Sequence, residues 1–340
     1  MENHNKHGGY IGDGNIIDYS VNINPFGISP RLKENIIKKL NSLDSYPEIN
    51  GDSTKEKLSE YLSIDKENTI IGNGATELIY LFIRAMNFKE IAILEPTFTE
   101  YERAAVLNQI KVVKLLDYDE IFKADSIDCL FICNPNNPTG KLLSEIELES
   151  ILKNAKQKDQ IVFIDESFIE FSDGRTAKDY IEEYNLFILR SITKIYGVPG
   201  LRVGFGIGSK EIIKKMDRIK EPWSINSLAL DALELYLIDE DYKKKTLEWY
   251  KREKRRMYLL LKSIEELEVF DSEANFFMIK MNISDGNELK KYCLDRGIYI
   301  RVCEDFYSLD KSYIRIAIRL EHENDIIVEL IREFFKSLNE

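Results

Sequence analysis

The sequence contains few of the residues that commonly bind metals or form disulfides. Its 340 residues include four cysteines and three histidines, and neither type shows the paired close spacing of a zinc site. We therefore expect no metal centre and interpret the cysteines as buried thiols. Cys129 and Cys133 are four positions apart in one apolar run, so in a strand both side chains should point to the same face. The residues concerned are Cys129, Cys133, Cys293, Cys303, His4, His7 and His322.

Long apolar runs and an excess of positive charge are also missing. No run reaches the about 18 apolar residues that a membrane-spanning helix needs, and the polar opening Met1–Lys6 is unlike a targeting segment. With 47 lysines and arginines against 59 aspartates and glutamates, the net charge is −12. This balance argues against broad binding to nucleic acid or to an anionic membrane. We therefore expect a soluble protein of the cytoplasm.

Short apolar runs alternate with helix-like stretches after residue 70. Most of these runs are continuously apolar, which is typical of strands buried on both faces. The alternation predicts an α/β domain with a mostly parallel sheet and helices on both sides. Ligands of such sheets bind beyond the carboxyl ends of the strands. The expected strands are residues 69–71, 91–94, 112–113, 129–132, 161–164, 186–189 and 203–205.

The pattern changes after about Leu228, where a long charged helical stretch is expected from Leu233 to Leu261. Acidic residues interrupt its basic runs, so we interpret it as a solvated face rather than as a nucleic-acid surface. Further strands alternate with helices beyond it and predict a smaller α+β domain. The expected division is an N-terminal arm with part of the small domain at 1–40, a large domain at 41–235 and a small C-terminal domain at 236–340. The expected strands of the small domain are 275–280, 298–301 and 313–319.

Three strands of the expected large sheet end in residues with complementary chemistry. Lys194 follows one strand, Asp165 ends a second, and a third runs into Asn-Pro-Asn-Asn-Pro-Thr-Gly at 134–140, which contains Asn137. Because parallel strands end at the same edge of a sheet, these side chains should lie together. Pyridoxal phosphate needs an amine for its aldehyde, an anion to keep its pyridine nitrogen protonated and a donor to its ring oxygen. The sequence therefore predicts a site for this cofactor.

A second group of residues is suited to an anion. The run Gly74-Ala75-Thr76 leads from a strand into a helix, where the amides of Ala75 and Thr76 can point towards a phosphate. The same run is equally consistent with a plain capped helix. Two hydroxyl groups and a guanidinium group near the lysine could complete the phosphate site. These further candidates are Ser191, Thr193 and Arg202.

The motifs occur in the order and at the spacing of a known family, and the chain resembles the fold-type-I pyridoxal phosphate enzymes over nearly its whole length. The resemblance implies a Schiff base of Lys194 with the cofactor, pairing of Asp165 with the pyridine nitrogen and a bond from Asn137 to the ring oxygen. It also implies that Gly74, Ala75, Thr76, Ser191, Thr193 and Arg202 surround the phosphate. The motifs that carry the resemblance are residues 134–140, Asp165-Glu166, Ser191-x-Thr193-Lys194 and Gly200-Leu201-Arg202-Val203-Gly204.

The same resemblance implies contacts to the ring, the substrate and a second subunit. Phe98 would stack on the cofactor ring, although a place in the core is the commoner fate of such an aromatic residue. Arg315 would bind the carboxylate of the substrate. Tyr46, in Tyr46-Pro47-Glu48, would reach the phosphate in the neighbouring subunit, which implies a homodimer with shared active sites.

Two subfamilies compete for the resemblance. The opening His7-Gly8-Gly9 and Asn-Ile-Asn-Pro at 22–25 are similar to L-threonine-O-3-phosphate decarboxylases of cobalamin synthesis, whereas histidinol-phosphate aminotransferases usually carry Asn-Glu-Asn-Pro. Phe168 stands where the aminotransferases usually have a tyrosine that bonds the ring oxygen. We therefore favour decarboxylation of a phosphorylated amino acid. The implied substrate contacts are His7, Gly8, Asn22, Arg301, Arg315 and Arg319.

Alternatives remain open at this point. An aminotransferase acting on a phosphorylated amino substrate is the second candidate, and a catalytically silent regulatory protein is the third, although the intact set of Lys194, Asp165 and Asn137 opposes it. O-phosphoserine and O-phosphothreonine are not distinguished, because one methyl group in a pocket is worth only about 1–3 kcal/mol.

Overall fold

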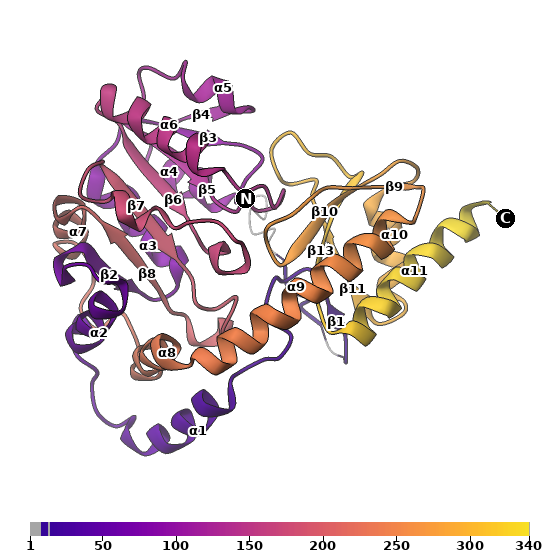
Figure 1. Cartoon of the computed structure of the whole chain (residues 1–340), viewed down its shortest axis with the longest axis horizontal. Helices are drawn as coiled ribbons and strands as arrows, with labels where there is room; N and C mark the ends of the chain where they lie inside the picture. The colour runs from indigo at the N-terminus through magenta and orange to yellow at the C-terminus, as the bar shows by residue number, and fades with distance from the viewer. Residues whose placement is uncertain (1–7, 13, 340) are drawn as a thin grey trace.

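The larger sheet of the computed structural model has seven strands, in the order β2-β8-β7-β6-β5-β3-β4 (Figure 1). The structure describes residues 8–12 and 14–339. Within them, β8 is the one strand of this sheet that runs opposite to the other six. The expected α/β fold with a mostly parallel sheet is therefore confirmed. The strands are β2 (Thr69–Gly72), β3 (Glu90–Leu94), β4 (Lys111–Leu115), β5 (Cys129–Cys133), β6 (Ile161–Asp165), β7 (Leu186–Arg190) and β8 (Gly204–Gly208).

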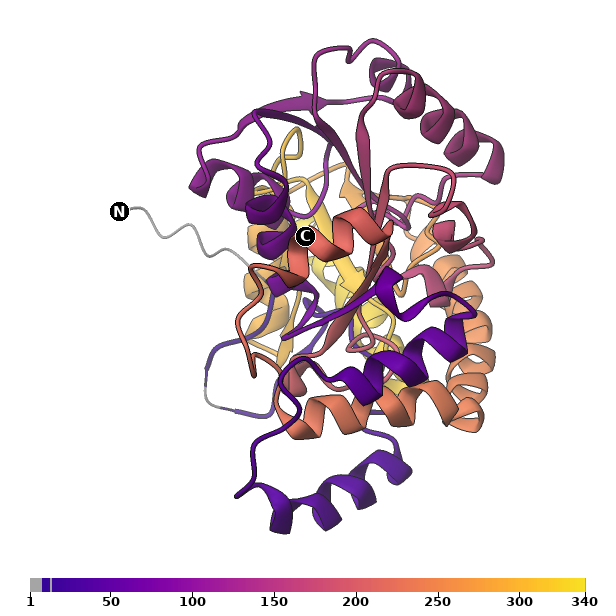
Figure 2. The same cartoon turned by 90° about the vertical axis from the view of Figure 1, so that its left-hand side faces the viewer.

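Both faces of the large sheet are covered by helices (Figures 1 and 2). Phe131 packs on the side of α3, α4 and α7 and stacks on Phe163 with ring centroids 4.5 Å apart. Cys129 and Cys133 point to this same side, as expected, while the intervening Leu130 packs on the other. Helices α2, α6 and α8 cover that opposite side. The helices are α2 (Asp52–Leu62), α3 (Ala75–Met86), α4 (Glu100–Leu107), α5 (Tyr118–Ile121), α6 (Glu145–Gln157), α7 (Lys210–Asp217) and α8 (Ser227–Ile238).

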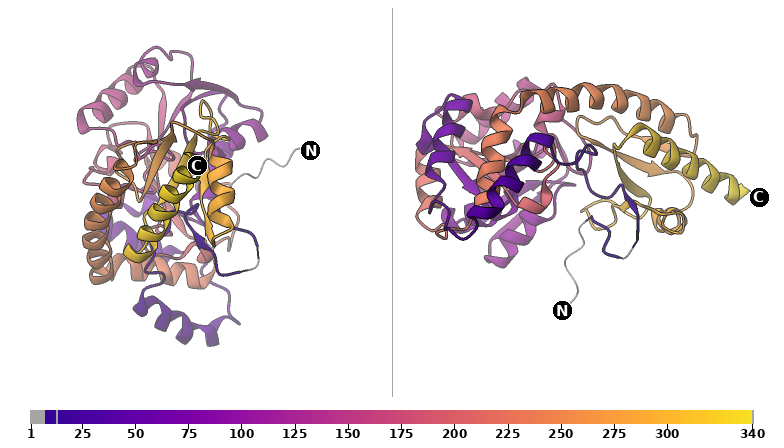
Figure 3. Two further views of the ribbon diagram at one scale, coloured as in Figure 1. Left: turned by 90° about the vertical axis from the view of Figure 1, so that its right-hand side faces the viewer. Right: turned by 90° about the horizontal axis from the view of Figure 1, so that it is seen from below.

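A second, antiparallel sheet of four strands lies beside the first, in the order β12-β13-β10-β9. Helix α9 runs from the large sheet along the small sheet. Helices α10 and α11 also pack beside the small sheet (Figures 1 and 3). A short parallel pair, β1 with β11, joins the N-terminal segment to this region. The exact domain boundaries remain a prediction. The elements are β1 (Ile17–Asp18), α9 (Glu240–Lys262), β9 (Leu267–Val269), β10 (Phe276–Met281), α10 (Gly286–Leu294), β11 (Ile298–Tyr299), β12 (Arg301–Val302), β13 (Tyr313–Ala317) and α11 (Glu321–Asn339).

The helical stretch expected from Leu233 to Leu261 is two helices, α8 and α9, which meet at Asp239. The Asp239 carboxylate accepts hydrogen bonds from the hydroxyl groups of Ser29 (2.7 Å) and Tyr196 (2.6 Å). With φ −93° and ψ 58°, its backbone leaves the helical region. The expected helical character is therefore confirmed, but the break at Asp239 was not predicted, because the partners that hold it lie far away in the sequence.

Most basic residues of α9 are exposed, as expected of a solvated face, and Lys243 is an exception. Lys243 is buried next to the rings of Tyr61 and Tyr236 and pairs with Glu240. Other basic residues of the helix form ion pairs, such as Lys254 with Glu273 at 2.8 Å. Within the described part of the chain, no helix is both long and apolar enough to cross a membrane.

Gly197 offers a test of how closely the loop after β7 packs. It has φ +68°, and a Cβ added to it would lie 2.3 Å from the carbonyl oxygen of Gly27. Because the obstacle is backbone, we expect Gly197→Ala to lower the free energy of unfolding by about 1–3 kcal/mol. Gly200→Ala meets no atom within 4 Å and should change it by less than about 0.5 kcal/mol. Urea denaturation checks this, and equal stabilities of the two variants would contradict the packing.

Candidate active site

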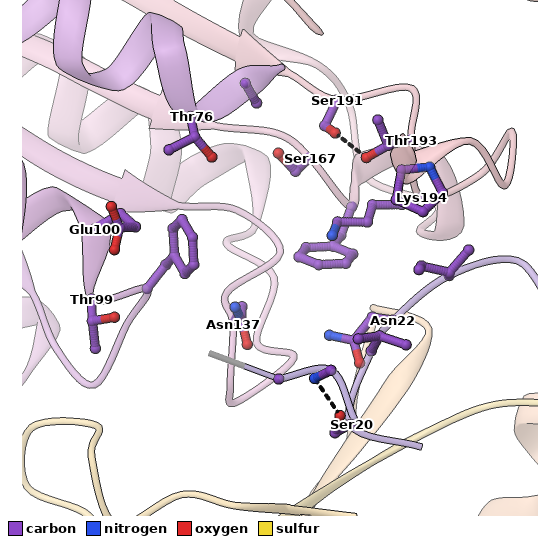
Figure 4. Close-up of a pocket in the computed structure, with 18 of the residues that line it drawn as sticks. Ser20, Asn22, Thr76, Thr99, Glu100, Asn137, Ser167, Ser191, Thr193 and Lys194 are labelled. Atoms are coloured by element: carbon purple, nitrogen blue, oxygen red, sulfur yellow. Dashed lines mark hydrogen bonds between the residues drawn. The ribbon is translucent and has the colours of Figure 1, made fainter. Parts of the chain in front are cut away.

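Three neighbouring parallel strands of the large sheet end at the same level. The register pairs Cys133 of β5 with Asp165 of β6, and Asp165 with Leu189 of β7. Asp165 is the last residue of β6, while residues 134–140 follow β5 and Lys194 lies in the loop after β7. The loops therefore open into one cavity, into which Lys194 and Asn137 point from different sides (Figure 4).

This active-site cavity has a volume of about 730 Å³, a size typical of small-molecule sites. Its walls come from the large sheet, from residues 8–11 and 20–23, and from Arg301, Phe306 and Arg315 of the small sheet region. The predicted site residues that line it are Gly8, Asn22, Ala75, Thr76, Phe98, Asn137, Asp165, Ser191, Thr193, Lys194, Arg202, Arg301 and Arg315.

Lys194 carries an amine whose charge is disfavoured here. Burial lowers the pKa of Lys194 from 10.5 to about 8, and the positive charges of Arg315 and Arg202 act in the same direction, while Asp165 opposes them. The backbone of the lysine is held by Asn24, whose N–H donates to the Lys194 carbonyl oxygen at 2.9 Å. Near neutral pH this amine can therefore be converted to its neutral, nucleophilic form at little cost.

Asp165 is held by two donors that we did not predict. The Tyr101 hydroxyl donates to Oδ2 at 2.6 Å and the Ser167 N–H donates to Oδ1 at 2.8 Å. Burial raises the pKa of Asp165 above its ordinary value, and these two bonds and Lys194 counteract that rise. Tyr101 also meets the ring of Phe98 edge-on, with centroids 5.7 Å apart. In the sequence, the one indication that Tyr101 belongs to the site is its place three residues after Phe98.

The part of the cavity beside Lys194 is built for an anion. Helix α3 begins after Gly74, which has φ +81° and no side chain to cap the first amides. A Cβ at Gly74 would lie 2.6 Å from Nη2 of Arg202, so glycine allows this guanidinium group to approach the helix N-terminus. The hydroxyl groups of Ser191 and Thr193 are hydrogen-bonded to each other at 2.8 Å (Figure 4). Together the helix amides, the hydroxyl groups and the guanidinium group suit a phosphate group, and this set is here called the anion cradle.

Arg315 connects three parts of the chain at the cavity wall. Its Nη1 donates to Oδ1 of Asn137 and its Nη2 to the carbonyl oxygen of Ser20 at 2.6 Å. Burial lowers the pKa of Arg315 to about 10. Its Nε, like Oδ1 of Asn22, is buried without a hydrogen-bond partner among the described residues. Buried polar atoms are normally satisfied, so these two atoms are suited to receiving a polar ligand.

Some predicted site residues lie elsewhere. Arg319 does not line the cavity, because its guanidinium group pairs with Glu323 at 3.1 Å and donates to the carbonyl oxygen of Asp18 at 3.2 Å. Tyr46 is 86% exposed and rests on the ring of Trp223. Gly74 does not line the cavity and lies against Arg202. His7 lies outside the described residues.

A neutralisable amine, a buried carboxylate and an anion cradle around one cavity suit a cofactor with an aldehyde, a ring nitrogen and a phosphate group. The unpaired Arg315 Nε and Asn22 Oδ1 are available for hydrogen bonds to a substrate beside the cofactor. The fold and the cavity thus define a pyridoxal phosphate-dependent enzyme. The chain belongs to the aminotransferase class I and II family, whose model matches residues 14–331. Pyridoxal phosphate is its cofactor, while the roles of individual residues towards it remain predictions.

Similar proteins carry two different names. A protein of Caldanaerobacter subterraneus subsp. tengcongensis, provisionally named a threonine-phosphate decarboxylase, is 39% identical over 96% of this chain and 94% of its own. The structure of histidinol-phosphate aminotransferase from Clostridium acetobutylicum has a TM-score of 0.89 and 34% identity, and covers 94% of this chain and 99% of its own. That of L-threonine-O-3-phosphate decarboxylase from Porphyromonas gingivalis has a TM-score of 0.88 and 26% identity over the same shares. Membership of the family therefore does not select the reaction.

The lowered pKa of Lys194 predicts how the stability of the cofactor-free protein depends on pH. Between pH 8 and 10.5 the folded chain binds fewer protons at this lysine than the unfolded chain. The free energy of unfolding of the wild type, taken relative to that of Lys194→Met, should therefore rise with pH through this window. The expected rise is about 1–2 kcal/mol after allowance for solvent screening. Urea denaturation at several pH values measures it, and the exposed Lys214→Met on α7 provides the background. A constant difference between wild type and Lys194→Met would contradict the assignment.

Proposed function

We propose that the protein decarboxylates L-threonine O-3-phosphate to CO2 and (R)-1-amino-2-propanol O-2-phosphate, as a cytoplasmic enzyme of cobalamin synthesis. The observation that carries the proposal is Phe168. Its buried ring meets Phe276 edge-on at 5.1 Å, and Nζ of Lys194 lies 5.9 Å from its centroid. This position therefore offers no hydroxyl group to the ring oxygen, where the aminotransferases usually place a tyrosine. The relatives named as threonine-phosphate decarboxylases support the same reaction.

The residues around the cavity receive the following roles in this proposal. Lys194 holds the aldehyde of the cofactor, Asp165 keeps the pyridine nitrogen protonated, and Asn137 donates to the ring oxygen. Phe98 stacks on the ring. When bound, pyridoxal phosphate supplies a conjugated ring that accepts the electron pair of the bond broken at Cα. The phosphate ligands are Ala75, Thr76, Ser191, Thr193 and Arg202.

Arg315 orients the carboxylate that leaves. Its guanidinium plane is held at both terminal nitrogens, by Asn137 and by the carbonyl oxygen of Ser20, and its Nε is without a partner. A fixed guanidinium group can bind one carboxylate in one orientation, which selects the bond at Cα that breaks. The amine of Lys194, with a pKa of about 8, can return a proton to Cα after CO2 has left. Arg301 and Asn22 line the same cavity and are further candidates for contacts with the substrate.

Transamination of histidinol phosphate with 2-oxoglutarate is the second candidate. Its support is the aminotransferase of Clostridium acetobutylicum, which is 34% identical to this chain. The two reactions differ in which bond at Cα would break with the cofactor bound, the bond to the carboxylate or the bond to hydrogen. They are therefore separated by their products.

The proposal predicts CO2 release from phosphothreonine without any keto acid. Decarboxylation leaves the amino group on the product and needs no keto acid, so release should continue over many turnovers, whereas transamination without a keto acid would stop after one. Arg315→Ala should lower kcat/KM by about 10²-fold or more, because a misplacement near 1 Å is enough for such a loss. Transfer of the amino group of histidinol phosphate to 2-oxoglutarate, with no CO2 from phosphothreonine, would establish the aminotransferase instead.

We further propose a homodimer with shared active sites. Helix α1 (Pro30–Lys39) and the segment after it stand apart from the large sheet (Figures 1 and 2). Large apolar side chains on this segment are exposed, together with Trp223 against which Tyr46 packs. An exposed apolar patch of this kind favours an interface between proteins. The exposed residues are Ile37, Leu40, Leu43, Tyr46, Ile49 and Trp223.

Mixed dimers test this arrangement. If Tyr46 serves the active site of the other subunit, a dimer of one Tyr46→Ala chain and one Lys194→Ala chain contains one intact site. Co-refolding the two variants should therefore give up to about half the activity of the wild-type dimer per mixed dimer, whereas each variant alone stays weak. Activity no higher than the sum of the separate variants would place Tyr46 in its own subunit's site or outside both. A monomer in sedimentation would refute the dimer.

A further inference from the structure

Residues Gly8–Ile11, here called the strap, form part of the wall of the active-site cavity together with Ser20. The strap is tied down by two hydrogen bonds to side chains that follow it in the sequence. The N–H of Gly9 donates to Oγ of Ser20 at 2.7 Å (Figure 4), and the N–H of Tyr10 donates to Oδ2 of Asp18 at 2.8 Å. The strap therefore depends on Asp18 and Ser20.

Asp18 organises both of these bonds although it does not line the cavity. Its Oδ1 accepts from the N–H of Ser20 at 2.8 Å and from the Ser20 hydroxyl at 2.6 Å. The hydroxyl that donates to Asp18 is the one that accepts from Gly9, so its orientation is set by the carboxylate. One carboxylate thus holds the strap directly at Tyr10 and indirectly at Gly9.

The fit between the strap and Ser20 is close. A Cβ at Gly8 would lie 2.3 Å from the carbonyl oxygen of Ser20, and Gly9 has φ +114°, which favours glycine. The same carbonyl oxygen accepts from Nη2 of Arg315 at 2.6 Å. The backbone of residues 18–20 therefore holds the buried Arg315, while the Asp18 side chain holds the strap.

We propose that Asp18 is a positioning residue that holds the strap closed over the active-site cavity and thereby determines how tightly the substrate is bound. For the identity of the substrate, the inference rests on the proposed function. Charge-assisted hydrogen bonds are stronger than neutral ones, so one carboxylate can order a short segment rich in glycine. Loss of that order opens one wall of the cavity and weakens binding, whereas Lys194 and the anion cradle come from the loops of the large sheet and are untouched.

Asp18→Asn is the sharpest variant. The amide oxygen can still accept from Ser20, but an NH2 group then faces the N–H of Tyr10, so the direct bond to the strap is lost. We expect KM for phosphothreonine to rise by about 10-fold, with kcat within about 3-fold of wild type. Ser20→Ala removes the acceptor for Gly9 without changing any charge and should shift KM in the same direction. The visible absorption of the bound cofactor should not change in either variant.

The chain provides a matched control in Asp310. Its carboxylate accepts from the N–H and the hydroxyl of Ser312, the same local turn as Asp18 with Ser20, but on an exposed loop away from the cavity. Asp310→Asn should leave KM and kcat at the wild-type values. An equal rise of KM in the two aspartate variants would overturn the proposal, because a general effect on stability would then explain both.

Hydrogen exchange of the cofactor-loaded enzyme tests the strap without any assay of activity. In Asp18→Asn, the amides of residues 9 and 10 should exchange at least about 10-fold faster than in wild type. Unchanged exchange, or faster exchange with KM unaltered, would overturn the proposal. If wild type does not decarboxylate phosphothreonine, the proposed function fails. KM is then measured with histidinol phosphate, and the same rise in Asp18→Asn supports the role of the strap.

Discussion

Strands β5, β6 and β7 end at the same level of the sheet, and the rest of the active site depends on this constraint. A slip of one residue between β5 and β6 would turn the Asp165 side chain to the other face of the sheet, away from Lys194. The one antiparallel strand serves the same edge. Because β8 runs in the opposite direction, its first residues lie at the carboxyl ends of the other strands, and Arg202 just before it reaches the anion cradle. Strand direction and register thus place these residues around one cavity.

Burial sets the chemistry within that frame. It lowers the pKa of Lys194 to about 8 and that of Arg315 to about 10, and it raises the pKa of Asp165. The amine becomes reactive for the same reason that it destabilises the fold. Arg315 is kept in place by donating to Asn137 and to a backbone carbonyl oxygen, and Asp165 by accepting from Tyr101 and from a backbone N–H. The cavity therefore combines reactive groups with a rigid surrounding.

Three distant parts of the chain meet at the cavity. The large sheet contributes Lys194 and Asn137, the small sheet contributes Arg315, and the N-terminal segment contributes Ser20 and Asn24. Asn24 holds the lysine loop through the Lys194 carbonyl oxygen, while Ser20 holds the arginine. A change in the N-terminal segment can therefore reach both the cofactor side and the substrate side of the cavity.

The sequence by itself determined the strands of the large sheet, because continuous apolar runs have few other places to go. It also predicted that Lys194, Asp165 and Asn137 lie together, as they do around the cavity, since the chemistry of one cofactor requires these residue types at strand ends. The tertiary structure alone decided contacts between residues far apart in the sequence. These include the bond from Tyr101 to Asp165, the helix break that Ser29 and Tyr196 hold, and the pairing that keeps Arg319 from the cavity. Such contacts leave no periodic trace, because each depends on the folded path of two separate segments.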